Sequence, residues 1–100
     1  MEEQDYSIKH FEMMTEIATQ LALLPAVILE HNYSYKTFGS WWFTFRRSDR
    51  EFRIVFDGRD DFLYIQDATD GFRDIDYRQL KRPTADIVAS ETYSLITQKT

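Results

Sequence analysis

The pattern of hydrophobic and polar residues divides the chain into a helix, a central block of strands and a second helix. Over Asp5–Leu24, apolar residues recur at the spacing of an amphipathic helix, and the stripe consists of Phe11, Met14, Ile17, Ala18 and Leu21. Pro25 disfavours a helical conformation at the residue before it, so the helix should end at Leu24. We expect this stripe to face the core.

From Ala26 the period of the pattern changes to two, which is typical of β-strands. In the first strand, one face should carry Val27, Leu29, His31, Tyr33 and Tyr35. The alternation continues through three further segments, Trp41–Arg46, Phe52–Phe56 and Phe62–Asp67. Phe72–Tyr77 carries three charged residues, which favours an edge strand. Asp57-Gly58 predicts a tight hairpin turn, because glycine tolerates a positive φ.

A last helix should begin at Thr84 and run nearly to the C-terminus. Its inner stripe is formed by Ala85, Val88, Ala89, Thr92, Leu95 and Ile96. The connections between strands are short, which indicates antiparallel neighbours. The predicted fold class is therefore α+β: an N-terminal helix, an antiparallel meander of four to five strands and a C-terminal helix, with both helices packed on one sheet face.

Length and composition favour a small soluble protein. The chain has 100 residues and no cysteine, which predicts a single domain over residues 1–100 and excludes disulfides and thiolate nucleophiles. The longest apolar run, around Leu21–Leu29, is interrupted by Pro25 and is shorter than the roughly 18–20 residues that cross a bilayer. The acidic start of the chain, Met1–Asp5, has the wrong charge for a signal or transit peptide. We expect a cytoplasmic protein with no membrane association.

The surplus negative charge is concentrated in one segment. The formal net charge is −5, and residues 57–76 account for all of it with seven aspartates against two arginines. The aspartates are Asp57, Asp60, Asp61, Asp67, Asp70, Asp74 and Asp76. They fall in two successive turns and an edge strand, so we expect them to form one negative rim that binds a basic partner. The alternative is that these aspartates have only local structural roles, because aspartate is common in turns and charged residues protect edge strands from pairing.

Aromatic residues make up 16% of the chain and offer candidate contact residues. Trp41 and Trp42 must point to opposite faces of their strand, so one of them faces away from the helices. Aromatic side chains are enriched at the energetic centres of interfaces. We therefore predict Trp42, Tyr64 and Phe72 as anchors for a protein partner. The other possibility for Trp42 is that it fills the core.

A basic cluster raises a different possibility. Arg46, Arg47, Arg50 and Arg53 lie around one predicted hairpin, close to Trp42. Arginines beside an exposed ring can bind phosphate and stack on a base, which would make the Arg46–Arg53 hairpin a nucleic-acid site. The net charge of −5 opposes this function.

Recognisable catalytic chemistry is absent from the sequence. His10 and His31 are the only histidines, and neither belongs to a catalytic motif. No serine lies in a nucleophile elbow, and three glycines do not form a phosphate loop. Asp57, Asp60 and Asp61 lack the ligand spacing of a calcium loop. We expect a protein that is not an enzyme and has no cofactor, metal or catalytic residue.

The segment Ser40–Asp67 contains an aromatic-rich strand followed by the hairpin Arg-Ile-Val-Phe-Asp-Gly-Arg at 53–59. This middle third, together with the order of elements and the chain length, resembles small immunity proteins of bacterial contact-dependent growth inhibition and related polymorphic toxin systems. The resemblance implies a tight, non-catalytic inhibitor that binds one cognate toxin, commonly a nuclease, in the cytoplasm. The resemblance assigns no functional role to any individual residue.

Two other function classes fit the same sequence. A secretion chaperone or adaptor can also be a small acidic α+β protein, and such proteins typically act as dimers with an apolar groove for a partner's unfolded segment. A nucleic-acid binder would use the Arg46–Arg53 hairpin. Whether the chain is a monomer or a homodimer stays open at this point.

Overall fold

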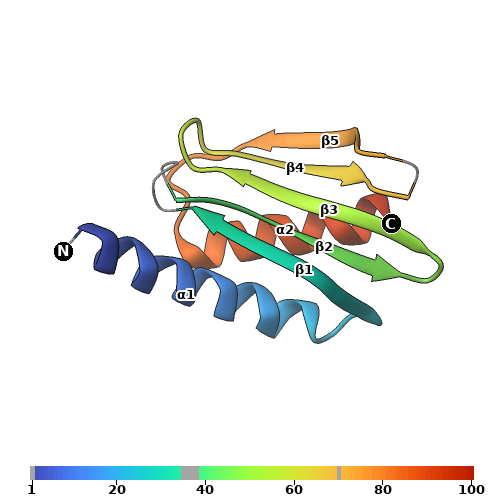
Figure 1. Cartoon of the computed structure of the whole chain (residues 1–100), viewed down its shortest axis with the longest axis horizontal. Coiled ribbons are helices and arrows are strands. Elements are labelled where there is room, and N and C mark those ends of the chain that lie inside the picture. Colours follow the sequence, from blue (N-terminus) through green and yellow to red (C-terminus); the bar gives the residue numbers. More distant parts are fainter. Residues whose placement is uncertain (1, 35–38, 70) are drawn as a thin grey trace.

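The computed structural model describes the backbone of residues 2–34, 39–69 and 71–100, and the side chains of residues 8, 10–33, 39–69 and 71–100. Its elements are α1 (Glu2–Leu21), β1 (Ala26–Ser34), β2 (Ser40–Arg47), β3 (Arg50–Asp57), β4 (Phe62–Asp67), β5 (Arg73–Gln79) and α2 (Ala85–Lys99). Both helices lie on the same side of the sheet, and the other side is open (Figure 1). The predicted α+β fold class and element order are confirmed.

The five strands form one antiparallel sheet in the order β1-β2-β3-β4-β5. Consecutive strands are neighbours because each connection is too short to cross another strand. β1 and β5 are therefore the two edges of the sheet. The prediction of an edge strand near the end of the meander is confirmed by β5.

The core lies between the sheet and the helices. Every second residue of the central strands is buried on this side, namely Trp41, Phe43, Phe45, Phe52, Ile54, Phe56, Leu63 and Ile65. Rings from neighbouring strands stack across it, with centroids 5.7 Å apart for Trp41 and Phe56. The Trp41 Nε1–H is directed at the Met13 sulfur, 3.2 Å away. The alternation arises because successive side chains of a strand point to opposite faces, although Thr44 on the other face of β2 is also buried.

Helix α2 packs against β4 and β5 of the sheet. Thr84 occupies its N-cap position, and the residues of its predicted stripe from Val88 to Ile96 are buried. Arg78 on β5 fixes the two elements together. Its guanidinium donates to Glu91 at 2.6 Å, to Ser94 at 3.0 Å and, through its other nitrogen, to Gln98 at 2.8 Å.

Helix α1 differs from its prediction in its ends and in its buried face. It runs from Glu2 to Leu21, so it stops three residues before the predicted end at Leu24. Ile17 and Leu21 are buried as expected, but Phe11 is 74% exposed. The reason is that α1 packs mainly against α2 rather than flat on the sheet. Part of the predicted stripe therefore has no strand beneath it.

Two local predictions for the strands are wrong. A β-bulge between Ile28 and Glu30 interrupts the alternation of β1, so Ile28 and His31, not Val27 and His31, share the helix side. Tyr35 lies outside the described residues. The β3–β4 connection spans residues 58–61, and the positive φ of 55° occurs at Asp61 rather than at Gly58. The longer connection removes the need for a tight glycine turn.

Candidate functional site

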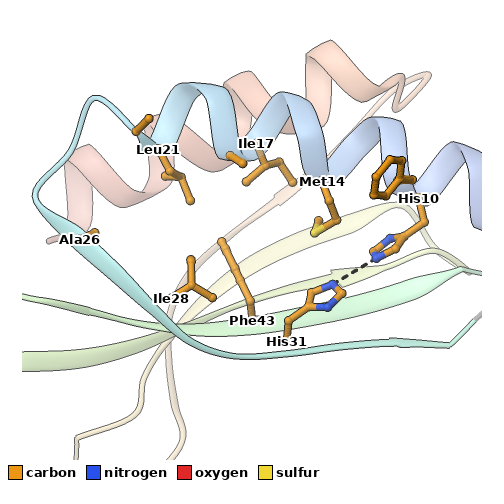
Figure 2. Close-up of a pocket in the computed structure, with 11 residues that line it drawn as sticks. His10, Met14, Ile17, Leu21, Ala26, Ile28, His31 and Phe43 are labelled. Carbon is orange, nitrogen blue, oxygen red and sulfur yellow. Dashed lines mark hydrogen bonds between the residues drawn. The ribbon is translucent and has the colours of Figure 1, made fainter.

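An apolar groove separates α1 from β1 and has a volume of about 510 Å³. Figure 2 shows Met14, Ile17 and Leu21 pointing from α1 toward Ile28 and Phe43 of the sheet. The lining is completed by His10, Phe11, Ala18, Ala22, Ala26 and His31. The groove exists because α1 leans on α2 and leaves β1 incompletely covered. Its lining can bind apolar side chains, because burying such surface is favourable.

His10 and His31 close one end of this groove (Figure 2). Their Nε2 atoms lie 3.1 Å apart, and the His10 ring stacks on Tyr33 with centroids 3.8 Å apart. One imidazole must donate from Nε2 and the other accept there, so the two rings are opposite tautomers when both are neutral. Burial, together with the nearby His31, lowers the pKa of His10 to about 4. Burial also lowers the pKa of His31.

The free edge of β1 borders the groove. Val27, Ile28 and Leu29 are 59%, 50% and 39% exposed, respectively. One side of an edge strand has backbone N–H and C=O groups that no neighbouring strand pairs. Natural edges are commonly protected by lysine, proline or a β-bulge; the β1 sequence AVILEHNYS contains neither lysine nor proline, and its one bulge lies between Ile28 and Glu30. This edge therefore offers both apolar side chains and backbone hydrogen-bonding groups.

The open face of the sheet carries the three predicted anchors. The register places Trp42, Val55, Tyr64 and Tyr77 in one row across β2 to β5. Trp42 thus faces away from the core, and Arg53 covers its ring with the guanidinium carbon 3.9 Å from the ring centroid. Phe72 lies on the other side of Arg53, with its ring centroid 3.7 Å from the same carbon. Burial raises the pKa of Tyr64, and Asp57 and Asp74 add to that effect.

The predicted single negative rim is wrong. Asp57 ends β3, and Asp60 and Asp61 follow in the β3–β4 connection just before β4 begins, whereas Asp67 is the last residue of β4. Successive turns of a meander lie at opposite ends of the strand between them, which here separates the two groups by roughly 20 Å at about 3.3 Å per residue. Figure 1 shows both ends of β4. Asp70 lies outside the described residues.

Several of the aspartates have structural partners. Asp67 is only 7% exposed, accepts from the Thr69 backbone N–H at 2.9 Å and forms an ion pair with Arg50. These hydrogen bonds, led by the one from Thr69, lower its pKa. Three others have local partners as well: Asp57 accepts from the Arg59 N–H, Asp74 from Gln66, and Asp76 pairs with Lys99 at 3.5 Å. Asp76 faces the helix side beside Ile65, and Asp74 faces the open side.

The predicted arginine cluster is also dispersed. Arg50 pairs with Asp67, and Arg47 donates to the Thr100 hydroxyl at 3.0 Å on the helix side. Arg46 and Arg53 lie on the open face. Alternation along the strands sends neighbouring arginines to opposite sides of the sheet. The Arg46–Arg53 hairpin therefore does not present one basic surface.

The groove and the histidine pair were not predicted. The stripe of α1 was expected to be buried, and no local pattern connects His10 with His31, which lie 21 positions apart. One signal could have indicated the groove: β1 begins with the apolar run Ala-Val-Ile-Leu, so apolar side chains lie on both faces of this strand.

Comparison with known proteins gives no match: no family model, no curated protein and no solved structure is significantly similar to this chain. Within the described residues, neither helix combines the length and apolar character that crossing a membrane requires. No group of three or more histidine or acidic side chains among the described residues has an arrangement that could hold a metal ion.

Proposed function

We propose that this protein is a non-catalytic protein-binding module that binds an extended apolar segment of a partner in the groove between α1 and β1. The observation that carries this proposal is the combination of a groove of about 510 Å³ with an adjoining free strand edge. The volume lies in the range of about 300–1,000 Å³ that is usual for ligand sites. Apolar side chains such as Ile17, Phe43 and Leu21 supply the floor and wall.

Strand addition explains how both features act together. A partner segment that pairs with β1 would satisfy the backbone groups of this edge and extend the sheet by one strand. Its side chains would then alternate between the open side and the helix side. Those on the helix side would enter the groove, beside Ile28 and beneath α1. Main-chain bonds would thus supply affinity, and the groove would select apolar residues at every second position.

The groove favours the chaperone or adaptor among the functions that the sequence left open, because such a protein holds an unfolded apolar segment. Inhibition of a bacterial toxin stays a second candidate. It is supported by the gathering of Trp42, Tyr64 and Phe72 on the open face, which is a different surface. The aspartates do not lie together, so they give no support for a basic toxin as the partner.

Selection from a random peptide library displayed on phage tests the groove. We expect selected peptides to carry apolar residues at alternate positions and to shift the amide NMR signals of β1. Ile28→Asp, which puts a charge into the lining, should weaken the best peptide by about tenfold or more, because burying an unpaired charge is costly. Leu23→Asp is the matched control: Leu23 is 76% exposed and lies outside the lining.

Two further measurements test whether the partner adds a strand to β1 and which of the two candidate functions applies. A peptide methylated at alternate backbone nitrogens, on the side that would pair with β1, should lose binding if a strand is added and retain it if only side chains are held. Light scattering then separates the two candidate functions. A strict monomer contradicts a dimeric chaperone. If a bound toxin survives Ile28→Asp but is lost on Trp42→Ala, the partner uses the open face and the groove proposal is wrong.

A further inference from the structure

The second surface of interest is the open face of the sheet, at the stack formed by Trp42, Arg53 and Phe72. The guanidinium carbon of Arg53 lies 3.9 Å from the ring centroid of Trp42 and 3.7 Å from that of Phe72. Trp42 comes from β2, Arg53 from β3, and Phe72 from the connection that precedes β5. Residues far apart in the sequence therefore hold one arginine side chain from both sides.

Arg53 has no acceptor for its donors within the part of the chain that the structure describes. Its Nε–H is buried and unbonded. Three other arginines differ, since Arg47, Arg50 and Arg78 bond to Thr100, Asp67 and Glu91. A guanidinium carries five N–H donors in a plane that matches a carboxylate. Arg53 is therefore a partly desolvated guanidinium on the open face, with one buried unbonded donor and no protein acceptor among the described residues.

We propose that Arg53, held between Trp42 and Phe72, binds a carboxylate of an acidic side chain on a partner polypeptide. The two rings orient the guanidinium before binding, so little side-chain freedom remains to be lost when the partner arrives. Trp42 and Phe72, which is 56% exposed, supply apolar surface around the ion pair. This combination of aromatic rings and arginine is typical of the residues that dominate binding energy at interfaces.

The charges around Arg53 favour a single carboxylate over a polyanion. The register places Glu30, Thr44, Arg53, Gln66 and Asp74 in one row across the sheet. Burial lowers the pKa of Arg53, and the nearby Glu30 opposes part of that effect. Glu30 and Asp74 on either side of Arg53 would repel a run of phosphates. A partner segment with one acidic residue between apolar ones carries a single negative charge, so these two carboxylates repel it less than they repel a run of phosphates.

This site is independent of the groove, because it lies on the opposite side of the sheet. The probe is the peptide acetyl-Phe-Glu-Phe-amide, titrated at constant ionic strength into the isotope-labelled full chain, with acetyl-Phe-Gln-Phe-amide as the uncharged counterpart. The NMR signals of the Arg53 Nε–H and the Trp42 indole N–H report binding. We expect saturable shifts with the glutamate peptide and at least about fivefold weaker binding of the glutamine peptide, since charge-assisted bonds are the stronger kind.

Variants of the same chain separate charge from geometry. The Arg53→Gln variant should bind the glutamate peptide only as weakly as the wild type binds the glutamine peptide. Arg53→Lys keeps the charge but should also lose most of the preference, because an ammonium does not stack as a plane. Arg46→Gln is the matched control, since Arg46 is exposed on the same face and should leave binding unchanged. Ile28→Asp should leave it unchanged as well, which separates this test from that of the groove.

Three results would overturn the proposal. Equal binding of the glutamate and glutamine peptides would show that the rings alone are recognised. Undiminished binding by Arg53→Gln would place the carboxylate elsewhere. Tighter binding of a uridine hexanucleotide than of the glutamate peptide, lost on Arg53→Gln, would assign the stack to nucleic acid instead.

Discussion

The Nε2 atom of His10 lies 3.1 Å from the Nε2 atom of His31, and this hydrogen bond joins α1 to the edge strand β1. The bond requires at least one imidazole to lack a proton at Nε2, because that nitrogen must accept. The pair therefore connects the protonation state of two side chains with the closure of one end of the groove.

Acidification should destabilise the protein through this pair. Burial lowers the pKa of His10 from 6.5 to about 4, so between these two pH values the unfolded chain binds a proton that the folded chain does not. The free energy of unfolding is therefore highest above pH 6.5, and it falls as the pH drops toward 4. We expect a loss on the order of 1–2 kcal/mol, after allowing for partial exposure to solvent.

Urea unfolding of the wild type and of the double variant His10→Gln with His31→Gln, followed from pH 7.5 to pH 4.5, measures this loss. The double variant should show a flatter dependence over this range. Carboxylates such as Asp76, whose pKa is lowered by the Tyr77 N–H, contribute only at more acidic pH. Identical slopes for both proteins would contradict the assignment to the histidines.

Asp67 should act as a structural residue rather than as a partner contact. It joins the start of β3 to the end of β4 through Arg50 and Thr69. Asp67→Asn should lower the urea midpoint, because it removes the charge that both partners stabilise. Asp74→Asn is the control: Asp74 is exposed and should change the midpoint little. Equal midpoints for the two variants would contradict a structural role for Asp67.

Arg78→Gln should loosen the attachment of α2 to the edge strand β5. The substitution removes the ion pair with Glu91 and the bonds to Ser94 and Gln98. We expect a cost of about 1–2 kcal/mol in the free energy of unfolding, as for a partly exposed charge-assisted network. Hydrogen exchange of the β5 amides should accelerate more than that of β3. Lys81→Gln, a nearby exposed cation, serves as the control.

A larger side chain in the groove should stabilise the folded protein and weaken the binding of peptides there. Ala18 is exposed and lines the groove, so a leucine there gains contact with the apolar wall. Ala18→Leu should raise the free energy of unfolding by about 1 kcal/mol, given roughly 0.8 kcal/mol per buried methylene and incomplete burial. The same variant should weaken binding of the peptides selected for the groove. A more stable variant with undiminished peptide binding would argue that the segment docks elsewhere.

Some parts of the candidate sites could be predicted from local pattern. Alternation along β2 was sufficient to place Trp41 and Trp42 on opposite faces. The structure decided that Trp41 is the buried one and that Trp42 lies on the open face in one row with Tyr64. The shared position of the aspartates was not predictable in this way. A cluster in the sequence becomes a cluster in space only if the chain between its members turns back on itself, and here β4 runs straight between them.

By itself, the sequence determined the elements, their antiparallel order and the core of the central strands, because these depend on periodicity and on the length of connections. It also determined the inner face of α2, from Val88 to Ile96. The tertiary structure alone decided where α1 rests. Whether a helix covers an edge strand or leans on its neighbouring helix depends on packing between distant residues, and that choice created the groove, brought His10 to His31 and left Phe11 in solvent.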